Sequence, residues 1–143
     1  MQISTDQADR MVKAAHAKAQ EIGVAVSVAI LDVGANLKAF SRMDGAWLGA
    51  TDVAMKKART SVLFENETQT VGEVSKPEAQ AHGLELTNDH LVTFAGGIPL
   101  KDSAGVLLGA VGVSGGQVAQ DYEVARAAAS ACHAGHTSTR SCS

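Results

Sequence analysis

The sequence predicts an α+β fold in which helices pack against an antiparallel β-sheet. Three observations predict this class: a helical spacing of apolar residues near the start of the chain, two pairs of β-forming runs that are each joined by a turn, and a glycine-bounded apolar run that leads into a final helix. Strands joined by short turns pair antiparallel, and the helices fall outside these pairs, so helices and sheet are expected to form separate layers.

The composition is typical of one globular domain, which we expect over residues 1–133, with a flexible tail at 134–143. The 143 residues are 45% hydrophobic and 19% charged. A net charge of −3 and an aromatic content of 3% argue against nucleic-acid binding. We see no secretion signal and no apolar run near the roughly 18 residues of a membrane span, so we expect a cytoplasmic protein without membrane attachment. The abundant small side chains favour a homo-oligomer.

The first helix is predicted over residues 5–22. Ser4 and Gln7 have the spacing of a capping box, and Gly23 provides the stop. Apolar residues at intervals of three and four give this helix one buried face. That face comprises Ala8, Met11, Val12, Ala15, Ala19 and Ile22.

An antiparallel hairpin and a second helix follow. Residues 24–31 and 37–42 are β-forming runs, and the turn chemistry of residues 32–36 joins them. A helix is predicted over about 47–64. The candidates for its buried side are Leu48, Val53 or Ala54, Ala58, Val62 and Leu63.

The middle of the chain is polar and irregular over residues 65–88, with one short helical piece near 77–82. We expect mobility or partner contacts in this segment. Residues 91–100 are predicted to form a strand that Gly96-Gly97 interrupts. Pro99 favours an edge position for this strand, because proline has no amide hydrogen for a sheet ladder.

The apolar run at residues 106–113 is predicted to be the buried central strand. Ser114-Gly115-Gly116 ends it, and a helix follows over about 118–133 with Asp121 in its first turn. A strand, a glycine turn and a helix start can present backbone N–H groups to an anion. The alternative is a packed core strand with a tight turn, which is common in proteins of any function.

Several short motifs follow one another along the chain. They are GVAVSVAILD (residues 23–32), FSRMDGA (40–46), KART (57–60), GGIPL (96–100), GAVGVSG (109–115) and DYEVAR (121–126). With these motifs the chain resembles the GlcG/HbpS-like family of small haem-degrading or haem-binding domains, to which the C-terminal domains of PduO-type proteins are similar. It departs from the family pattern at Ser61 and most strongly between residues 64 and 91.

The resemblance implies a profilin-like fold with a five-stranded antiparallel sheet flanked by helices, assembled into homo-oligomers. It also implies a small ligand, because some members bind haem and some are proposed to bind small carboxylates. We expect haem as the possible cofactor and no metal site.

Arg42 and Asp44 lie where the first hairpin becomes a loop. Arg42 is a candidate to grip a carboxylate at two points, and Asp44 to orient the ligand or act as a base. The alternative is a capped turn with a surface ion pair.

Lys57 and Thr60, one helical turn apart, are candidates to hold an anionic ligand, but a solvated helix face is the favoured interpretation. The other ligand-binding candidates are Met43, Gly45, Gly97, Ser114, Gly115 and Gly116.

The histidines supply further candidates. His16, beside the apolar face of the first helix, is a candidate ligand of haem iron, with a plain surface residue as the alternative. His82 and His90 are candidate acid–base groups together with Asp44 and Asp121. The group Cys132, His133, His136 and Cys142 matches no zinc pattern, and the two cysteines predict no disulfide framework.

Two functions remain open from the sequence. The favoured one is a protein that binds haem or a small organic acid near the first hairpin and the glycine-rich turns. The other is a metal-independent isomerase or lyase that uses acid–base chemistry on a small organic acid or carbonyl compound.

Overall fold

A computed structural model of the chain describes residues 2–133. Its elements are helix α1 (Thr5–Ile22), strands β1 (Ser27–Asp32) and β2 (Leu37–Arg42), helices α2 (Ala50–Phe64) and α3 (Thr68–Ser75), the 3-10 turn η1 (Leu84–Leu86), strands β3 (Gly97–Lys101) and β4 (Leu107–Ser114), and helix α4 (Val118–Ser130). The predicted α+β class is confirmed.

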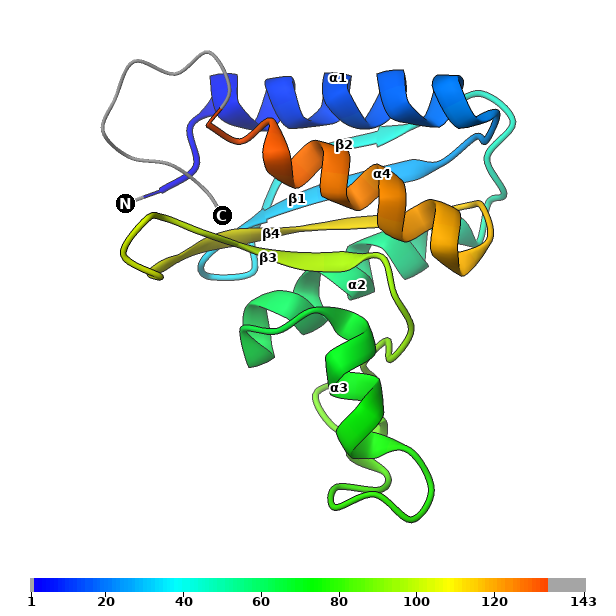
Figure 1. Cartoon of the computed structure of the whole chain (residues 1–143), viewed down its shortest axis with the longest axis vertical. Helices are drawn as coiled ribbons and strands as arrows, with labels where there is room; N and C mark the ends of the chain where they lie inside the picture. Colours follow the sequence, from blue (N-terminus) through cyan, green and yellow to red (C-terminus); the bar gives the residue numbers. More distant parts are fainter. Residues whose placement is uncertain (1, 134–143) are drawn as a thin grey trace.

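The strands form one antiparallel sheet in the order β2-β1-β4-β3. Helices α1 and α4 cover one face of the sheet, α2 covers the other, and α3 projects away from the sheet (Figure 1). The glycine-bounded run, β4, lies inside the sheet between β1 and β3, as predicted. The prediction of a five-stranded sheet is wrong, because residues 2–133 contribute four strands. The sequence itself contains four β-forming runs, and the fifth came from the resemblance alone.

Helix α1 is held at both ends in the predicted way. The amide of Gln7 donates to Ser4 Oγ at 3.0 Å, and the amide of Ser4 donates to Gln7 Oε1 at 2.8 Å. Gly23 ends the helix in the left-handed region, with φ +76°. The face of α1 formed by Ala8, Met11, Ala15 and Ala19 is buried.

The two sides of β4 differ in the size of their residues. Val111 and Val113 point into the core beneath α1 and α4. The alternate residues face α2, and there the core is built from small side chains such as Ala54, Ala58 and Ala110. A Cβ at Gly112 would press on the carbonyl oxygen of Ala54 and lie 2.5 Å from the amide nitrogen of Ala58. Helix α2 therefore lies directly on the backbone of the central strand.

Helix α2 starts later than predicted. Residues 43–49 form turns, and the helix begins at Ala50. As a result Trp47 and Leu48 are exposed, with 79% and 78% of their surface accessible, and Leu63 is 40% exposed. The prediction of Leu48 and Leu63 on the buried side was therefore wrong, whereas Ala54, Ala58 and Val62 are buried as predicted.

The segment between α2 and β3 is the part that the sequence predicted least well. Its main helix is α3, not the piece near residues 77–82, which forms turns. Gly72 lies inside α3, where glycine is normally unfavourable, because a Cβ there would collide with the carbonyl oxygen of Thr93. Strand β3 begins only at Gly97, and α4 ends at Ser130 rather than 133.

Three further expectations concern the ends of the chain and the membrane. Cys132 is disulfide-bonded, although the cysteines predicted no disulfide framework. The predicted tail at 134–143, with His136 and Cys142, lies outside the described residues. Among residues 2–133, no helix combines the length and the apolar character that a membrane crossing requires.

We predict that Gly112→Ala lowers the free energy of unfolding by about 1–3 kcal/mol, because α2 must move off the sheet to admit a methyl group. Gly49→Ala is the matched control, since it has open space around its Cβ position and an ordinary φ; it should change stability by less than about 0.5 kcal/mol. Urea denaturation measures both, and equal stability of the two variants would contradict the close packing described above.

Candidate functional site

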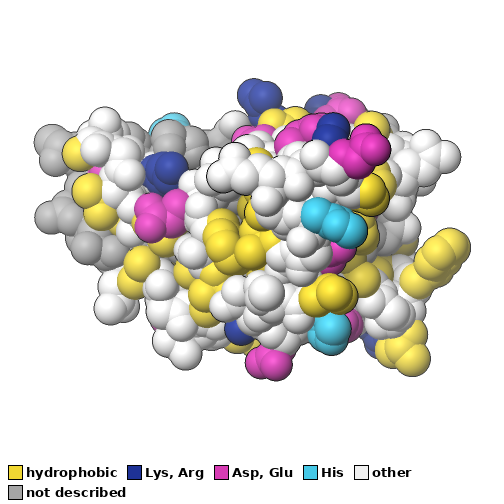
Figure 2. Space-filling model, turned by 90° about the horizontal axis from the view of Figure 1, so that it is seen from below, with side chains coloured by type: hydrophobic (Ala, Val, Ile, Leu, Met, Phe, Trp, Pro, Cys, Tyr) yellow, Lys and Arg dark blue, Asp and Glu magenta, His cyan; other side chains and the backbone are white. Residues whose placement is uncertain are grey.

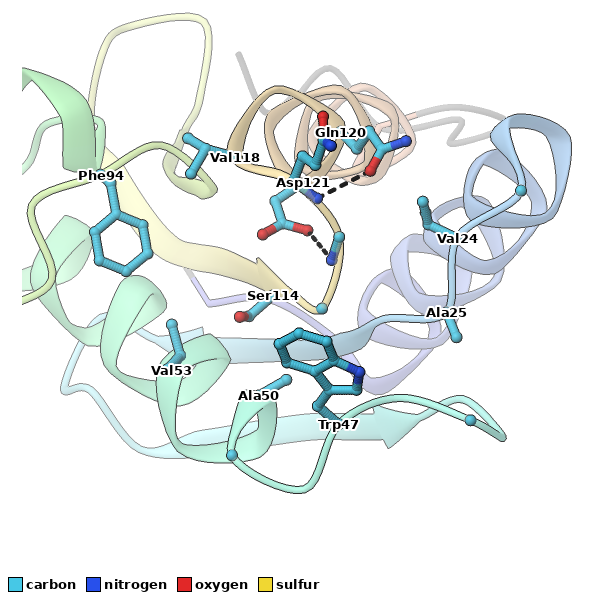
Figure 3. Close-up of a pocket in the computed structure, with 16 residues that line it drawn as sticks. Val24, Ala25, Trp47, Ala50, Val53, Phe94, Ser114, Val118, Gln120 and Asp121 are labelled. Carbon is cyan, nitrogen blue, oxygen red and sulfur yellow. Dashed lines mark hydrogen bonds between the residues drawn. The ribbon is translucent and has the colours of Figure 1, made fainter.

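A pocket lies where the start of α2, the end of β4 and the start of α4 come together, beside the α1–β1 connection (Figure 3). Its volume is about 790 Å³, within the range of small-molecule sites. The residues around it are Gly23, Val24, Ala25, Gly45, Trp47, Gly49, Ala50, Val53, Phe94, Ser114, Gly115, Gly116, Gln117, Val118, Gln120 and Asp121.

The glycine turn after β4 shapes one wall of this pocket. Gly115 has φ +140°, and a Cβ there would lie 2.5 Å from the carbonyl oxygen of Ala25. The amide of Gly116 donates to Asp121 Oδ1 at 2.8 Å, which folds the side chain of Asp121 back onto the turn (Figure 3). Gln117 and Gln120 form a reciprocal capping box at the start of α4. The turn therefore holds α4 in a fixed position above the end of β4.

An ion pair between Lys57 and Asp121 lies beneath the pocket. The Nζ of Lys57 donates to Asp121 Oδ2 at 3.1 Å and to the carbonyl oxygen of Val113 at 2.8 Å. Its side chain is fully buried and that of Asp121 is 4% exposed. The ammonium also lies 5.0 Å from the ring centroid of Phe94, a favourable cation–π distance. Lys57 thereby joins α2 to α4 across the end of β4.

Two glycines before and within β3 leave room for this lysine. A Cβ at Gly96 would lie 2.5 Å from Lys57 Nζ and 2.6 Å from the carbonyl oxygen of Val113. A Cβ at Gly97 would lie 2.5 Å from the carbonyl oxygen of Lys57. The motif that interrupts the predicted strand is therefore needed for the path of the Lys57 side chain.

Burial shifts the pKa of both partners toward the neutral form. Burial lowers the pKa of Lys57 below its usual value, and the Asp121 carboxylate opposes this. Burial likewise raises the pKa of Asp121, opposed chiefly by Lys57 and then by the amides of Gly116 and Gly115. Both oxygens of Asp121 accept hydrogen bonds from N–H donors, which is the geometry of an ionised carboxylate.

The structure brings some of the predicted ligand-binding residues to the pocket and leaves others outside it. Gly45, Ser114, Gly115, Gly116 and Asp121 line it. Arg42, Met43, Asp44, Lys57, Thr60 and Gly97 are not part of its lining. The pocket does not lie at Arg42: Arg42 pairs with Ser27 and Ser27 with Ser114, which puts Arg42 two strand spacings, roughly 10 Å, from Ser114.

The favoured interpretation of the second helix was wrong for Lys57, which is buried rather than solvated. A lysine on a helix is normally exposed, and the sequence around it gives no sign of the partner 64 positions away. Thr60 is buried as well. Its hydroxyl donates to the carbonyl oxygen of Lys56 and accepts from the amide of Val92, so it ties α2 to the segment before β3.

The histidines lie apart from the pocket. His16 is partly buried on α1, and its Nε2 lies 2.9 Å from Ser41 Oγ on β2. His82 and His90 are exposed. The end of the molecule that carries α3 shows histidine side chains at its surface among hydrophobic and acidic ones (Figure 2). Within residues 2–133, no group of three or more His, Cys, Asp or Glu residues is arranged to hold a metal ion.

Sequence analysis missed the aromatic walls of the pocket. Trp47 and Phe94 are two of the five aromatic residues in the chain (one Trp, one Tyr and three Phe). Both lie in loops, Trp47 before α2 and Phe94 before β3. The sequence did contain a signal for them, because aromatic residues are rare in this chain and these two lie in loops next to glycine motifs.

We predict that Lys57→Met lowers the free energy of unfolding by about 3–5 kcal/mol, because it leaves Asp121 buried without its charged partner. Lys56→Met is the matched control: Lys56 pairs with Asp52 at 3.3 Å on the surface, and its loss should cost less than about 1 kcal/mol. Thermal and urea denaturation of both variants check this, and similar losses for the two would contradict it.

Comparison with known proteins identifies the family. Residues 3–130 match the model of the haem-degrading protein HbpS-like family. An uncharacterised 15.0 kDa protein of Citrobacter freundii, from the dhaT–dhaS intergenic region, is 39% identical over 85% of each chain. The crystal structure of Klebsiella pneumoniae protein ORFY has a TM-score of 0.89 at 34% identity, covering 94% of this chain and 93% of that one. The crystal structure of a PduOC–haem complex has a TM-score of 0.87 at 35% identity, covering 92% and 95%. The chain described here belongs to the HbpS-like family.

Proposed function

We propose that this protein binds a small ligand, haem or a small organic acid. The pocket at the end of β4 is the proposed place for the apolar body of an organic acid, and His16, outside this pocket, is the proposed place for haem. The observation that carries the proposal is the pocket itself: about 790 Å³, walled by Trp47, Phe94 and Val53, with few polar groups. Apolar walls with a small number of placed polar groups are typical of sites for organic ligands.

The start of α4 is the proposed place for a carboxylate of the ligand. The first amides of a helix have no partner within it, and their positive end attracts anions. Gln117 and Gln120 line the pocket at this point and carry amide groups that donate hydrogen bonds. A ligand acid placed here would accept hydrogen bonds from these side-chain amides.

Haem is supported as a ligand by the PduOC–haem complex, whose structure this chain resembles over 92% of its length. Haem iron is normally held by His, Cys, Met or Tyr, and none of these is among the described residues that line the pocket. Haem would therefore be held outside this pocket, on the face of the sheet that α1 covers, and we propose His16 as its iron ligand. Its imidazole is partly buried, and the contact with Ser41 Oγ fixes the orientation of the ring.

We predict that titration with haemin gives a Soret band distinct from that of free haemin, and that His16→Ala weakens this binding by about tenfold or more, because an axial ligand is lost. His82→Ala is the matched control, since His82 is exposed and away from α1, and it should bind like the unmodified protein. A free-haemin spectrum with the unmodified protein would refute haem as the ligand, and full binding by His16→Ala would exclude His16.

One observation favours the second candidate, an acid–base enzyme. Among the described residues of the pocket lining, Asp121 alone carries an ionisable carboxyl. Burial raises its pKa, which makes it a stronger base than an ordinary aspartate. Asp44, His82 and His90, the other candidate bases, are exposed and outside the lining. A base at the pocket would abstract a proton next to the carbonyl group of a small acid.

In that case we predict that the protein accelerates exchange of the methyl protons of pyruvate in D₂O, and that Asp121→Asn lowers this rate by about 10²-fold or more. Asp44→Asn is the control and should retain the rate. Proton NMR measures the exchange, and thermal melting shows whether the Asp121 variant is folded. Absence of exchange with the unmodified protein would leave this candidate without support; loss of exchange in Asp44→Asn alone would assign the base to Asp44.

A further inference from the structure

The inner end of the pocket carries a polar side chain that has no partner. Ser114 lines the pocket and is 8% exposed, and within residues 2–133 its Oγ makes no hydrogen bond. Its cross-strand neighbour Ser27 is fully buried, and the Ser27 Oγ also lacks a partner. Buried hydroxyls are normally hydrogen-bonded, so the unpaired Ser27 hydroxyl beside a Ser114 hydroxyl that faces the pocket indicates a place for a polar group supplied from outside.

The direction of Ser114 follows from the alternation of side chains along β4. Ala110 and Gly112 face α2, so Ser114 faces α2 as well. Figure 3 shows the Ser114 side chain in the space between Val53, Phe94 and Asp121.

The second polar group at this end is the Asp121 carboxylate. Each of its oxygens accepts one hydrogen bond, from Lys57 or from the amide of Gly116. A carboxylate oxygen has two lone pairs, so each can accept another. Among residues 2–133, the pocket is lined by no Lys, Arg or His. A ligand carboxylate placed here would meet Asp121 without a cation at the pocket surface, whereas a hydroxyl can donate to Asp121 and accept from Ser114.

We infer that the inner end of the pocket is a subsite for an uncharged hydroxyl group of a ring-bearing ligand, with Ser114 and Asp121 as its partners and Trp47 and Phe94 beside the ring. This inference rests on the proposed function, since it assumes that the pocket binds a ligand. The inference specifies which end of the ligand enters the pocket first and which chemical group that end carries.

Benzyl alcohol and benzoate are the probes, because they share a ring and differ in the group that the subsite distinguishes. Trp47 is the single tryptophan of the chain and lines the pocket, so its fluorescence reports binding. At pH 7 benzyl alcohol should bind at least about tenfold more tightly than benzoate. Ser114→Ala should weaken benzyl alcohol about fivefold, by loss of one hydrogen bond, while the exposed control Ser103→Ala leaves it unchanged.

Equal or tighter binding of benzoate overturns the inference, as does a Ser114→Ala variant that binds benzyl alcohol normally. The comparison of the two probes uses the unmodified protein and so does not depend on the folding of a variant. A lack of any fluorescence change with both probes also overturns it. If haemin then still gives its Soret band, only the hydroxyl subsite is refuted; if haemin fails too, the proposed function falls with it.

Discussion

The buried ion pair between Lys57 and Asp121 is the interaction on which the pocket depends. It joins α2, on one face of the sheet, to the first turn of α4, on the other, around the end of the central strand. Desolvation of two charges is costly, and here it is offset by a direct contact, by the carbonyl of Val113 and by the amide of Gly116. Such a pair constrains the relative position of α2 and α4 more than it adds to the free energy of unfolding. It therefore determines the shape of the pocket that lies above it.

The small residues of the chain make this arrangement possible. Alanines and Gly112 let α2 lie against the backbone of β4, which brings Lys57 within reach of the far side of the strand end. Gly96 leaves space for the ammonium itself. The glycine motifs thus have a steric role: larger residues at these positions would separate the two helices, and the ion pair would not form.

The sequence predicted the elements whose signals are local. The capping box of α1, the first hairpin and the strand–glycine–helix unit from β4 to α4 depend on neighbouring residues and were recognised. Features that depend on distant contacts were missed. Lys57 looked like a solvated helix residue because its partner is Asp121, and α3 was overlooked because Gly72 is explained only by its contact with Thr93. The same reason explains why Arg42 was expected at the site. The end of a hairpin suggests a site, but the distance from Arg42 to the pocket depends on the register across three strands.

The two places proposed for ligands lie on opposite faces of the sheet. His16 contacts Ser41 on the side of β2 that α1 covers. Ser114 lies on the side that α2 covers, in one cross-strand row with Ser27 and Arg42. Because side chains alternate along each strand, the Ser41–His16 contact and this row are separated by the thickness of the sheet. A group bound at His16 and a small molecule bound at Ser114 would therefore not compete for the same atoms, and the aromatic wall of the pocket can serve a ligand that contains no iron.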